Sequence, residues 1–126
     1  MADDSIRANG TLRLSVLDDE EGSPAVDNIF EIEAPGTEGY VLGRSDAGSS
    51  YVPDVDLAPF NAQRRGISRR HAAIVSYRGI VRVVDLGSMN GTFINEERLP
   101  PRAVQDLKSG DRISLANLEV EVTKIT

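Results

Sequence analysis

Apolar and polar residues alternate along several short segments of the chain. Every second residue of segment 11–16 is apolar, and the same period of two recurs over 118–123. Ile113 and Leu115, just before that second segment, follow the same period. Alternation of this kind places one face of a β-strand against a core and the other toward water. The pattern therefore predicts strands near both ends of the chain. By the same reasoning and by composition, further strands are predicted over residues 27–33, 39–43, 72–77, 80–85 and 92–94.

Helices are expected to contribute little. Eleven glycines and six prolines divide the chain into segments, few of which have room for a helix of average length, about 11 residues. Only residues 101–109 are expected to form a helical turn. Many short strands separated by turns are typical of a β-sandwich, because one open sheet would leave an apolar face in water. We expect an all-β domain over residues 11–126, preceded by a flexible tail at 1–10 that has only Ile6 as an apolar anchor.

Composition excludes several kinds of site. The 126 residues suit one domain, and they include no cysteine and one histidine, His71. Disulfides, thiol nucleophiles, thiolate metal sites and multi-histidine metal cages are therefore excluded. The acids at 18–21 lack the alternating ligand spacing of a calcium loop, so with residues 22–24 they are interpreted as an exposed hairpin loop. We expect no metal and no cofactor.

The charge balance also limits the partners. Twenty acidic residues against 14 basic ones give a net charge of −6, which disfavours general binding to nucleic acid or anionic membranes. No apolar run approaches the roughly 20 residues that span a bilayer, and the polar first residues do not resemble a signal peptide. We expect a cytoplasmic protein with neither a nucleic-acid nor a membrane partner.

One short segment is strongly basic. Residues 64–71 read Arg-Arg-Gly-Ile-Ser-Arg-Arg-His and contain four arginines and no acid. On an acidic protein, so local a patch suggests a small anionic ligand rather than a long polyanion. A planar guanidinium also matches phosphate oxygens with paired donors, which an ammonium group cannot do. From this feature alone, a solubilising loop remains an equal alternative.

Two further elements accompany the basic segment. Gly43-Arg44 ends a predicted strand, and residues 87–92 (Gly-Ser-Met-Asn-Gly-Thr) form a tight connection with an Asn-Gly turn signal. Their order and spacing resemble the signature of the forkhead-associated (FHA) domain, in its bacterial form, over about residues 12–125. The segments that carry the resemblance are Gly43-Arg44, Ser68-Arg69-Arg70-His71, Asn90-Gly91-Thr92 with Asn95, and the runs at 83–86 and 110–113.

This resemblance implies a two-sheet β-sandwich of about eleven strands whose recognition loops lie at one end and bind phosphothreonine peptides. Arg44 and Ser68 match the family residues that contact the phosphate. Arg69 matches a position that often adds a contact, and Asn90 matches the residue that holds the peptide main chain.

Other family positions shape the loops or select the peptide. Gly43, His71 and Gly91 match loop-shaping positions, and the turn at Gly91 also predicts a positive φ. The family uses the region that here is 45–67, together with the loop at 88–91, to select the third residue after the phosphothreonine.

Three residues in these regions are candidates for that selection. Arg64 and Arg65 suggest an acidic peptide residue, although both are equally interpreted as solvated side chains. Met89 stands where some members have a hydroxyl residue, so one polar contact is expected to be missing or replaced by an apolar preference.

Catalysis is not expected. Ser68, His71 and Asp85 can be written as a triad, but Ser68 and His71 lie three residues apart in one loop, without a nucleophile elbow. The sequence also has no Walker loop and no Rossmann glycine pattern. We predict a non-catalytic module that recruits a partner phosphorylated by a Ser/Thr kinase, of undetermined oligomeric state. The alternative is a phosphate-independent scaffold that uses a sheet face, if segment 45–67 covers the pocket.

Overall fold

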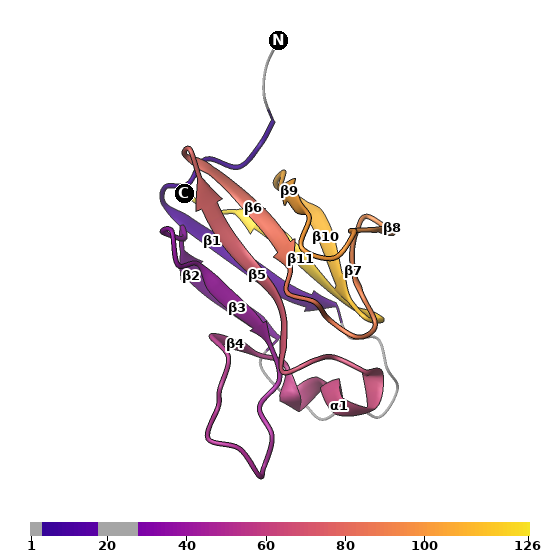
Figure 1. Ribbon diagram of the computed structural model, residues 1–126. Helices are drawn as coiled ribbons and strands as arrows, with labels where there is room; N and C mark the ends of the chain where they lie inside the picture. Colours follow the sequence, from indigo (N-terminus) through magenta and orange to yellow (C-terminus); the bar gives the residue numbers. More distant parts are fainter. Residues whose placement is uncertain (1–3, 18–27) are drawn as a thin grey trace.

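The computed structural model describes residues 4–17 and 28–126, which form eleven strands in two sheets (Figure 1). This confirms the predicted all-β sandwich. Every strand predicted from the sequence pattern is present. The expected hairpin loop at 18–24 lies outside the described residues.

In the first sheet, the alternating apolar residues of the strands face the core. Within β1 the even-numbered residues Leu12, Leu14 and Val16 are buried, and their neighbours are not. β1 lies between β2 and β11, antiparallel to both, and Leu14 is opposite Val122 on β11. In spatial order the strands are β2 (Ile29–Glu33), β1 (Thr11–Leu17), β11 (Leu118–Lys124), β10 (Asp111–Leu115), β7 (Thr92–Ile94) and β8 (Glu97–Arg98).

The second sheet carries the segments that lead into the predicted site. β3 pairs with β4 in parallel and with β5 antiparallel, and the register shifts between Leu42 and Gly43. In spatial order its strands are β4 (Val55–Asp56), β3 (Tyr40–Gly43), β5 (Arg70–Tyr77), β6 (Ile80–Asp85) and β9 (Val104–Asp106).

The core lies between the two sheets. Leu14 and Val120 from the first sheet and Ile74 and Val83 from the second are fully buried in one apolar cluster. Burying a side chain of this size contributes about 1.5–3 kcal/mol. Because the space between the two sheets is filled by apolar side chains, a polar binding site is expected in the loops at the strand ends.

One secondary-structure prediction was wrong. Residues 101–109 contain strand β9 instead of a helical turn, and Val104 and Asp106 pair with Val84 and Arg82 of β6. Pairing with the open edge of β6 satisfies the backbone of this segment, and local propensity does not reveal such a partner.

The helical residues lie inside the predicted long connection 45–67. They form a 3₁₀ turn, η1 (Ala58–Phe60), and a single helical turn, α1 (Ala62–Arg65). Figure 1 shows α1 at one end of the sandwich, away from both chain termini. Across residues 4–17 and 28–126, no helix has the length and apolar character needed to cross a membrane.

Part of the segment predicted as a tail packs against the second sheet. Ile6 is only 4% exposed, its N–H donates to the Leu107 carbonyl at 2.7 Å, and its carbonyl accepts the Val81 N–H at 2.8 Å. Ser5 and Arg7 form bridges with Lys108 and Ile80. Residues 1–3 of the predicted tail lie outside the described residues.

Candidate functional site

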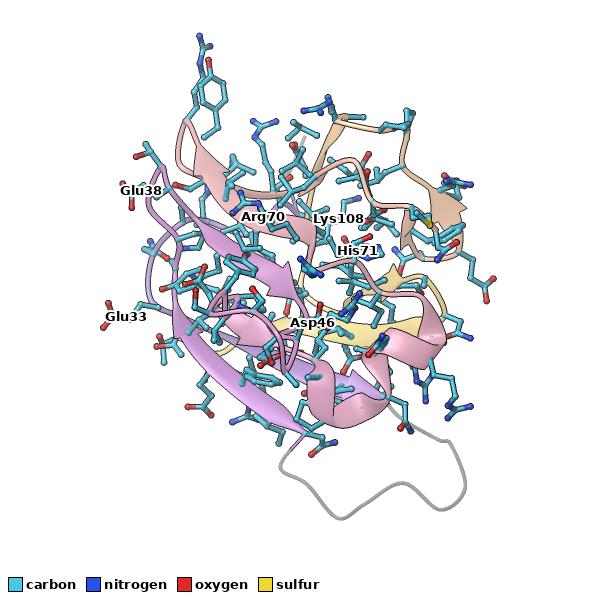
Figure 2. The ribbon with its side chains drawn as sticks, turned by 60° about the horizontal axis from the view of Figure 1, so that its bottom comes forward. Glu33, Glu38, Asp46, Arg70, His71 and Lys108 are labelled. Carbon is cyan, nitrogen blue, oxygen red and sulfur yellow. The ribbon has the colours of Figure 1, made fainter. Side chains whose placement is uncertain are left out.

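The predicted contact residues lie on three loops. Arg44 follows β3, Ser68 and Arg69 lie in the 66–69 loop between α1 and β5, and Met89 and Asn90 lie in the 86–91 loop between β6 and β7. Hydrogen bonds connect these loops, so the structure brings the sequence-predicted residues together. Figure 2 is turned toward the end of the sandwich that carries α1 and places Asp46 and His71 near the centre of the view.

Gly43 allows the backbone after β3 to approach the 66–69 loop. A Cβ atom on Gly43 would lie 1.9 Å from the carbonyl oxygen of Arg69, which no side chain tolerates. The next residue, Arg44, donates its N–H to the same oxygen at 3.2 Å. The β-bulge at Leu42/Gly43 and this close contact set where the Arg44 side chain begins.

The Arg44 guanidinium is held in place by two groups. Its Nε donates to the Ile67 carbonyl at 2.6 Å, and its Nη1 is paired with the Asp46 carboxylate. The side chains of Arg44 and Asp46 are only 17% and 18% exposed. Arg44 is therefore positioned before any ligand arrives.

Arg69 meets the same carboxylate from the other side. Its Nε lies 2.6 Å from Oδ2 of Asp46, whose Oδ1 pairs with Arg44. The Arg69 side chain is 60% exposed, so it borders the site at the solvent side. Sequence reasoning missed Asp46, because nothing in the sequence indicates that this acid meets an arginine 23 residues away.

His71 is buried between two of the loops. Its Nδ1 accepts the backbone N–H of Ser68 at 3.0 Å, and its Nε2 lies 2.8 Å from the carbonyl oxygen of Gly91. Because a backbone N–H can only donate, the ring is neutral, with its hydrogen on Nε2. Burial lowers the pKa of His71 below its ordinary 6.5, and the opposing effects of the Gly91 carbonyl and Asp85 are smaller.

Two more hydrogen bonds join the 66–69 and 86–91 loops. The Met89 N–H donates to Ser68 Oγ at 3.2 Å, and Asn90 Nδ2 donates to the Gly66 carbonyl at 2.8 Å. As the acceptor from Met89, the Ser68 hydroxyl keeps its own hydrogen for another partner. Asn90 likewise keeps one amide hydrogen and its carbonyl oxygen beyond this bond.

Asp85, at the end of β6, organises the 86–91 loop. Its carboxylate accepts the N–H groups of Gly87 and Ser88 at 2.9 and 3.1 Å and the hydroxyls of Ser88 and Thr92 at 2.5 and 2.6 Å. Burial alone would raise the pKa of Asp85, but the hydrogen bonds from Ser88, Thr92 and Gly87 outweigh it and hold the pKa below 3.8. Asp85 is thus a structural anchor of the loop.

The arrangement differs from a catalytic triad. His71 receives the backbone N–H of Ser68 rather than its hydroxyl, and that hydroxyl accepts the Met89 N–H. Asp85 binds its own loop through hydroxyl and amide groups. His71 and Asp85 therefore build the loops that hold Ser68 in place.

Gly91 has φ +92°, the left-handed conformation that the turn predicted. A Cβ there would lie 2.8 Å from Nε of Arg98, whose guanidinium stands over the Phe93 ring at 5.9 Å. Arg98 comes from β8, a strand that the sequence pattern did not predict, and it places a further cation beside the 86–91 loop.

The three candidate selectivity residues lie in different surroundings. Arg65 donates from Nε to the Phe60 carbonyl at 2.9 Å and from Nη1 to Asn117 at 3.4 Å, so it reaches toward the β10–β11 turn. Arg64 precedes it in the single turn of α1. Met89 is 85% exposed at the rim of the 86–91 loop.

Asp56 holds the start of the long 45–54 loop. Its carboxylate accepts the N–H and the hydroxyl of Ser45 at 2.9 and 2.6 Å and the Ala58 N–H at 3.0 Å. Burial would raise the pKa of Asp56, but these hydrogen bonds keep the pKa below its ordinary 3.8. The backbone beside Arg44 and Asp46 is thereby fixed.

Comparison with known proteins assigns the chain to a family. The family model described as FHA domain matches residues 40–116. The chain is 43% identical over 91 residues to the oxoglutarate dehydrogenase inhibitor of Corynebacterium efficiens, an alignment that covers 72% of this chain and 53% of that protein. The chain therefore spans about half the length of this curated relative.

Solved structures show the same fold. The FhaA FHA domain, complexed with the intracellular domain of Rv3910, is similar with a TM-score of 0.61 and 26% identity, covering 88% of this chain and 98% of that one. EmbR of Mycobacterium tuberculosis, in complex with a low-affinity phosphopeptide, is similar with a TM-score of 0.64 and 23% identity, covering 90% of this chain and 24% of that one.

Proposed function

This chain belongs to the FHA domain family, and we propose that it binds phosphothreonine peptides with the loops that carry Arg44, Ser68 and Asn90. It is a non-catalytic binding module: its polar residues are arranged to hold an anion and a peptide backbone. The partner is a protein phosphorylated by a Ser/Thr kinase, and the complex forms in the cytoplasm.

One observation carries this proposal. The guanidinium groups of Arg44 and Arg69 converge on a single carboxylate, that of Asp46. Two cations that already hold one anion are placed to hold another. A phosphothreonine brings nearly two negative charges and three acceptor oxygens, which such a pair of arginines can satisfy.

The neighbouring groups have roles that fit this ligand. The Ser68 hydroxyl donates its remaining hydrogen to a phosphate oxygen. Asn90, fixed by Gly66, offers its amide carbonyl and its second amide hydrogen to the peptide main chain. Gly43, His71 and Gly91 support these groups by shaping the loops rather than by contacting the ligand.

Selection of the third residue after the phosphothreonine is assigned to the rim of the site. Met89 offers an exposed apolar contact, and Arg64 offers a charge suited to an acidic residue. Arg65 reaches toward the β10–β11 turn, where its guanidinium contacts the Phe60 carbonyl and Asn117.

A degenerate phosphothreonine peptide library, run beside its phosphoserine and unphosphorylated versions, tests the proposal. We expect binding that needs the phosphate and falls roughly tenfold to more than a hundredfold in Arg44→Ala, because a charge-assisted hydrogen bond contributes about 1.5–3 kcal/mol. Ser68→Ala should also weaken binding. If both variants fold and bind the phosphorylated peptides as tightly as the wild type, the site assignment is wrong.

A second candidate function rests on the outer face of the second sheet. Four apolar residues lie in register across it, and the last, Val104, is 53% exposed. These residues are Val41, Ala73, Val84 and Val104. Ala73 is only 5% exposed, so the exposed Val104 on β9 is what supports a phosphate-independent contact with another protein. This second function would be favoured if none of the three peptide libraries binds and a protein that binds the wild type fails to bind Val104→Asp.

A further inference from the structure

We propose that Asp46 is a built-in competitor for the phosphate. In the free protein its carboxylate occupies both Arg44 and Arg69, and a phosphothreonine displaces it on binding. As a consequence, the site discriminates a doubly charged phosphate from a singly charged carboxylate. This inference rests on the proposed function and adds a residue that determines affinity and ligand charge.

The contacts of Asp46 use both of its oxygens. Oδ1 pairs with Nη1 of Arg44, and Oδ2 lies 2.6 Å from Nε of Arg69. The side chain is only 18% exposed, so the carboxylate is set into the loops rather than extended into solvent. It occupies the position between two cations that an incoming anion needs.

The donors of Arg44 show why the two anions compete. Its Nε is committed to the Ile67 carbonyl at 2.6 Å, so a paired contact with a phosphate has to use Nη1 and Nη2. Asp46 occupies Nη1. A phosphate placed beside a remaining carboxylate would also meet a like charge at close range. Nη1 carries a second hydrogen, so the competition is one of charge and space: a phosphate bound to both terminal nitrogens stands beside the Asp46 carboxylate and favours its departure.

Asp46 can leave without unfolding the loop. The preceding residue, Ser45, is anchored by two hydrogen bonds to Asp56, and the Asp46 carbonyl accepts the Ser49 N–H at 3.2 Å in a turn. Neither contact involves the Asp46 carboxylate. Rotation of that one side chain would release both guanidinium groups from their ion pairs and leave these backbone contacts in place.

Charge decides which ligands win this competition. A phosphothreonine carries about −1.5 to −2 at neutral pH, which exceeds the single charge of Asp46. A glutamate in place of the phosphothreonine brings no more charge than Asp46 supplies. Asp46 also has the advantage of tethering, equivalent to a local concentration on the order of millimolar or more. Carboxylate mimics of the phosphothreonine should therefore fail on the wild-type protein.

The test compares Asp46→Asn and Asp46→Ala with the wild type by calorimetric titration. The ligands are one phosphothreonine peptide, selected by screening the library on both the wild type and Asp46→Asn, and its Thr→Glu counterpart. If Asp46 blocks the site about nine-tenths of the time, removing its charge tightens phosphopeptide binding roughly tenfold. The Thr→Glu peptide should show no binding to the wild type and measurable binding to Asp46→Asn.

A matched control separates the effect of the Asp46 charge at the site from the effect of changing the net charge of the protein. Glu31→Gln also removes one acidic charge, but Glu31 is an exposed residue of β2 that pairs with Arg13 at 3.0 Å. We expect its peptide affinities to equal those of the wild type. Thermal unfolding of each variant establishes that it is folded before its titration is interpreted.

The outcomes distinguish this inference from the proposed function. If Arg44-dependent phosphopeptide binding is present but the Asp46 variants bind equally or more weakly, Asp46 supports the site and the inference is wrong. If neither the wild type nor the Asp46 variants bind, the proposed function itself is wrong. Binding by the Asp46 variants alone would support both and show that Asp46 closes the wild-type site.

Discussion

Nε2 of the buried His71 donates to the carbonyl oxygen of Gly91 at 2.8 Å, and so ties the 66–69 loop to the 86–91 loop. On the other side of the ring, Nδ1 accepts the Ser68 N–H. One neutral imidazole therefore holds the backbone beside a proposed phosphate contact and the backbone beside Asn90. The separation of these two loops depends on this ring staying neutral.

Protonation of His71 should destabilise the fold. Its folded-state pKa lies below the ordinary 6.5, so the unfolded chain binds more protons as the pH falls below 6.5. The contribution of His71 is complete above that pH and is lost as the pH falls toward the folded-state pKa, at up to about 1.4 kcal/mol per pH unit. Urea unfolding at pH 7.0 and 5.5 measures this loss.

The variant His71→Gln provides the comparison. The chain has one histidine, so the variant has no other imidazole to titrate in this pH window. It should be less stable than the wild type at pH 7.0 and change less between the two pH values. Equal changes in both proteins would contradict the role given to His71.

Removing the charge of Asp85 should loosen the 86–91 loop. Asp85→Asn weakens four hydrogen bonds from Gly87, Ser88 and Thr92, and we expect a loss of about 2–3 kcal/mol in the free energy of unfolding. Because the folded-state pKa of Asp85 is lowered, its contribution is present above pH 3.8 and is lost as the pH falls through the lower, folded-state value.

The control for Asp85 is Asp54→Asn. Asp54 accepts one backbone N–H, that of Val41 at 2.8 Å, at an exposed position. Its substitution should have a clearly smaller effect, measured by chemical denaturation at pH 7. Equal losses in the two variants would show that the four contacts of Asp85 carry no special weight.

Gly43 should not tolerate even a methyl group. In Gly43→Ala the new Cβ would lie 1.9 Å from the Arg69 carbonyl oxygen, so the backbone has to move, at a cost of about 1–3 kcal/mol. The shift also displaces Arg44, and phosphopeptide affinity should fall with stability. Gly48→Ala is the control on the next loop, because nothing lies within 4 Å of its Cβ position. Similar melting temperatures for the two variants would refute this account.

Ile6 should contribute as a core residue. Its side chain is buried against the second sheet, so Ile6→Ala is expected to lose about 2–4 kcal/mol of unfolding free energy. Ile125→Ala makes the same change at a residue that is exposed, and its effect should be much smaller. A negligible effect at Ile6 would support an independent tail up to residue 10, as the sequence suggested.

Local pattern was enough for most of the fold. The alternation in β1 and β11 selects one buried face. The tight connection expected around Asn90-Gly91 is present, and it carries the chain from β6 in the second sheet to β7 in the first. Local pattern did not reveal β9, whose exposed residues carry no clear alternation and whose strand form depends on the edge of β6. The sequence named Ile6 as an apolar anchor but did not reveal its partners, because Val81 and Leu107 are distant in sequence.

The sequence by itself determined the kind of site: an arginine after a glycine, a serine in a basic loop and an asparagine in a tight turn, in one order and spacing. Those features are local, because each depends on the chemistry of a side chain and the conformation of its own loop. Only the tertiary structure decided that Asp46 stands between Arg44 and Arg69, and that His71 joins the 66–69 and 86–91 loops. These contacts depend on which strand ends of the second sheet lie side by side. Hydrophobic periodicity does not encode that arrangement, because it reports only which face of each strand is buried.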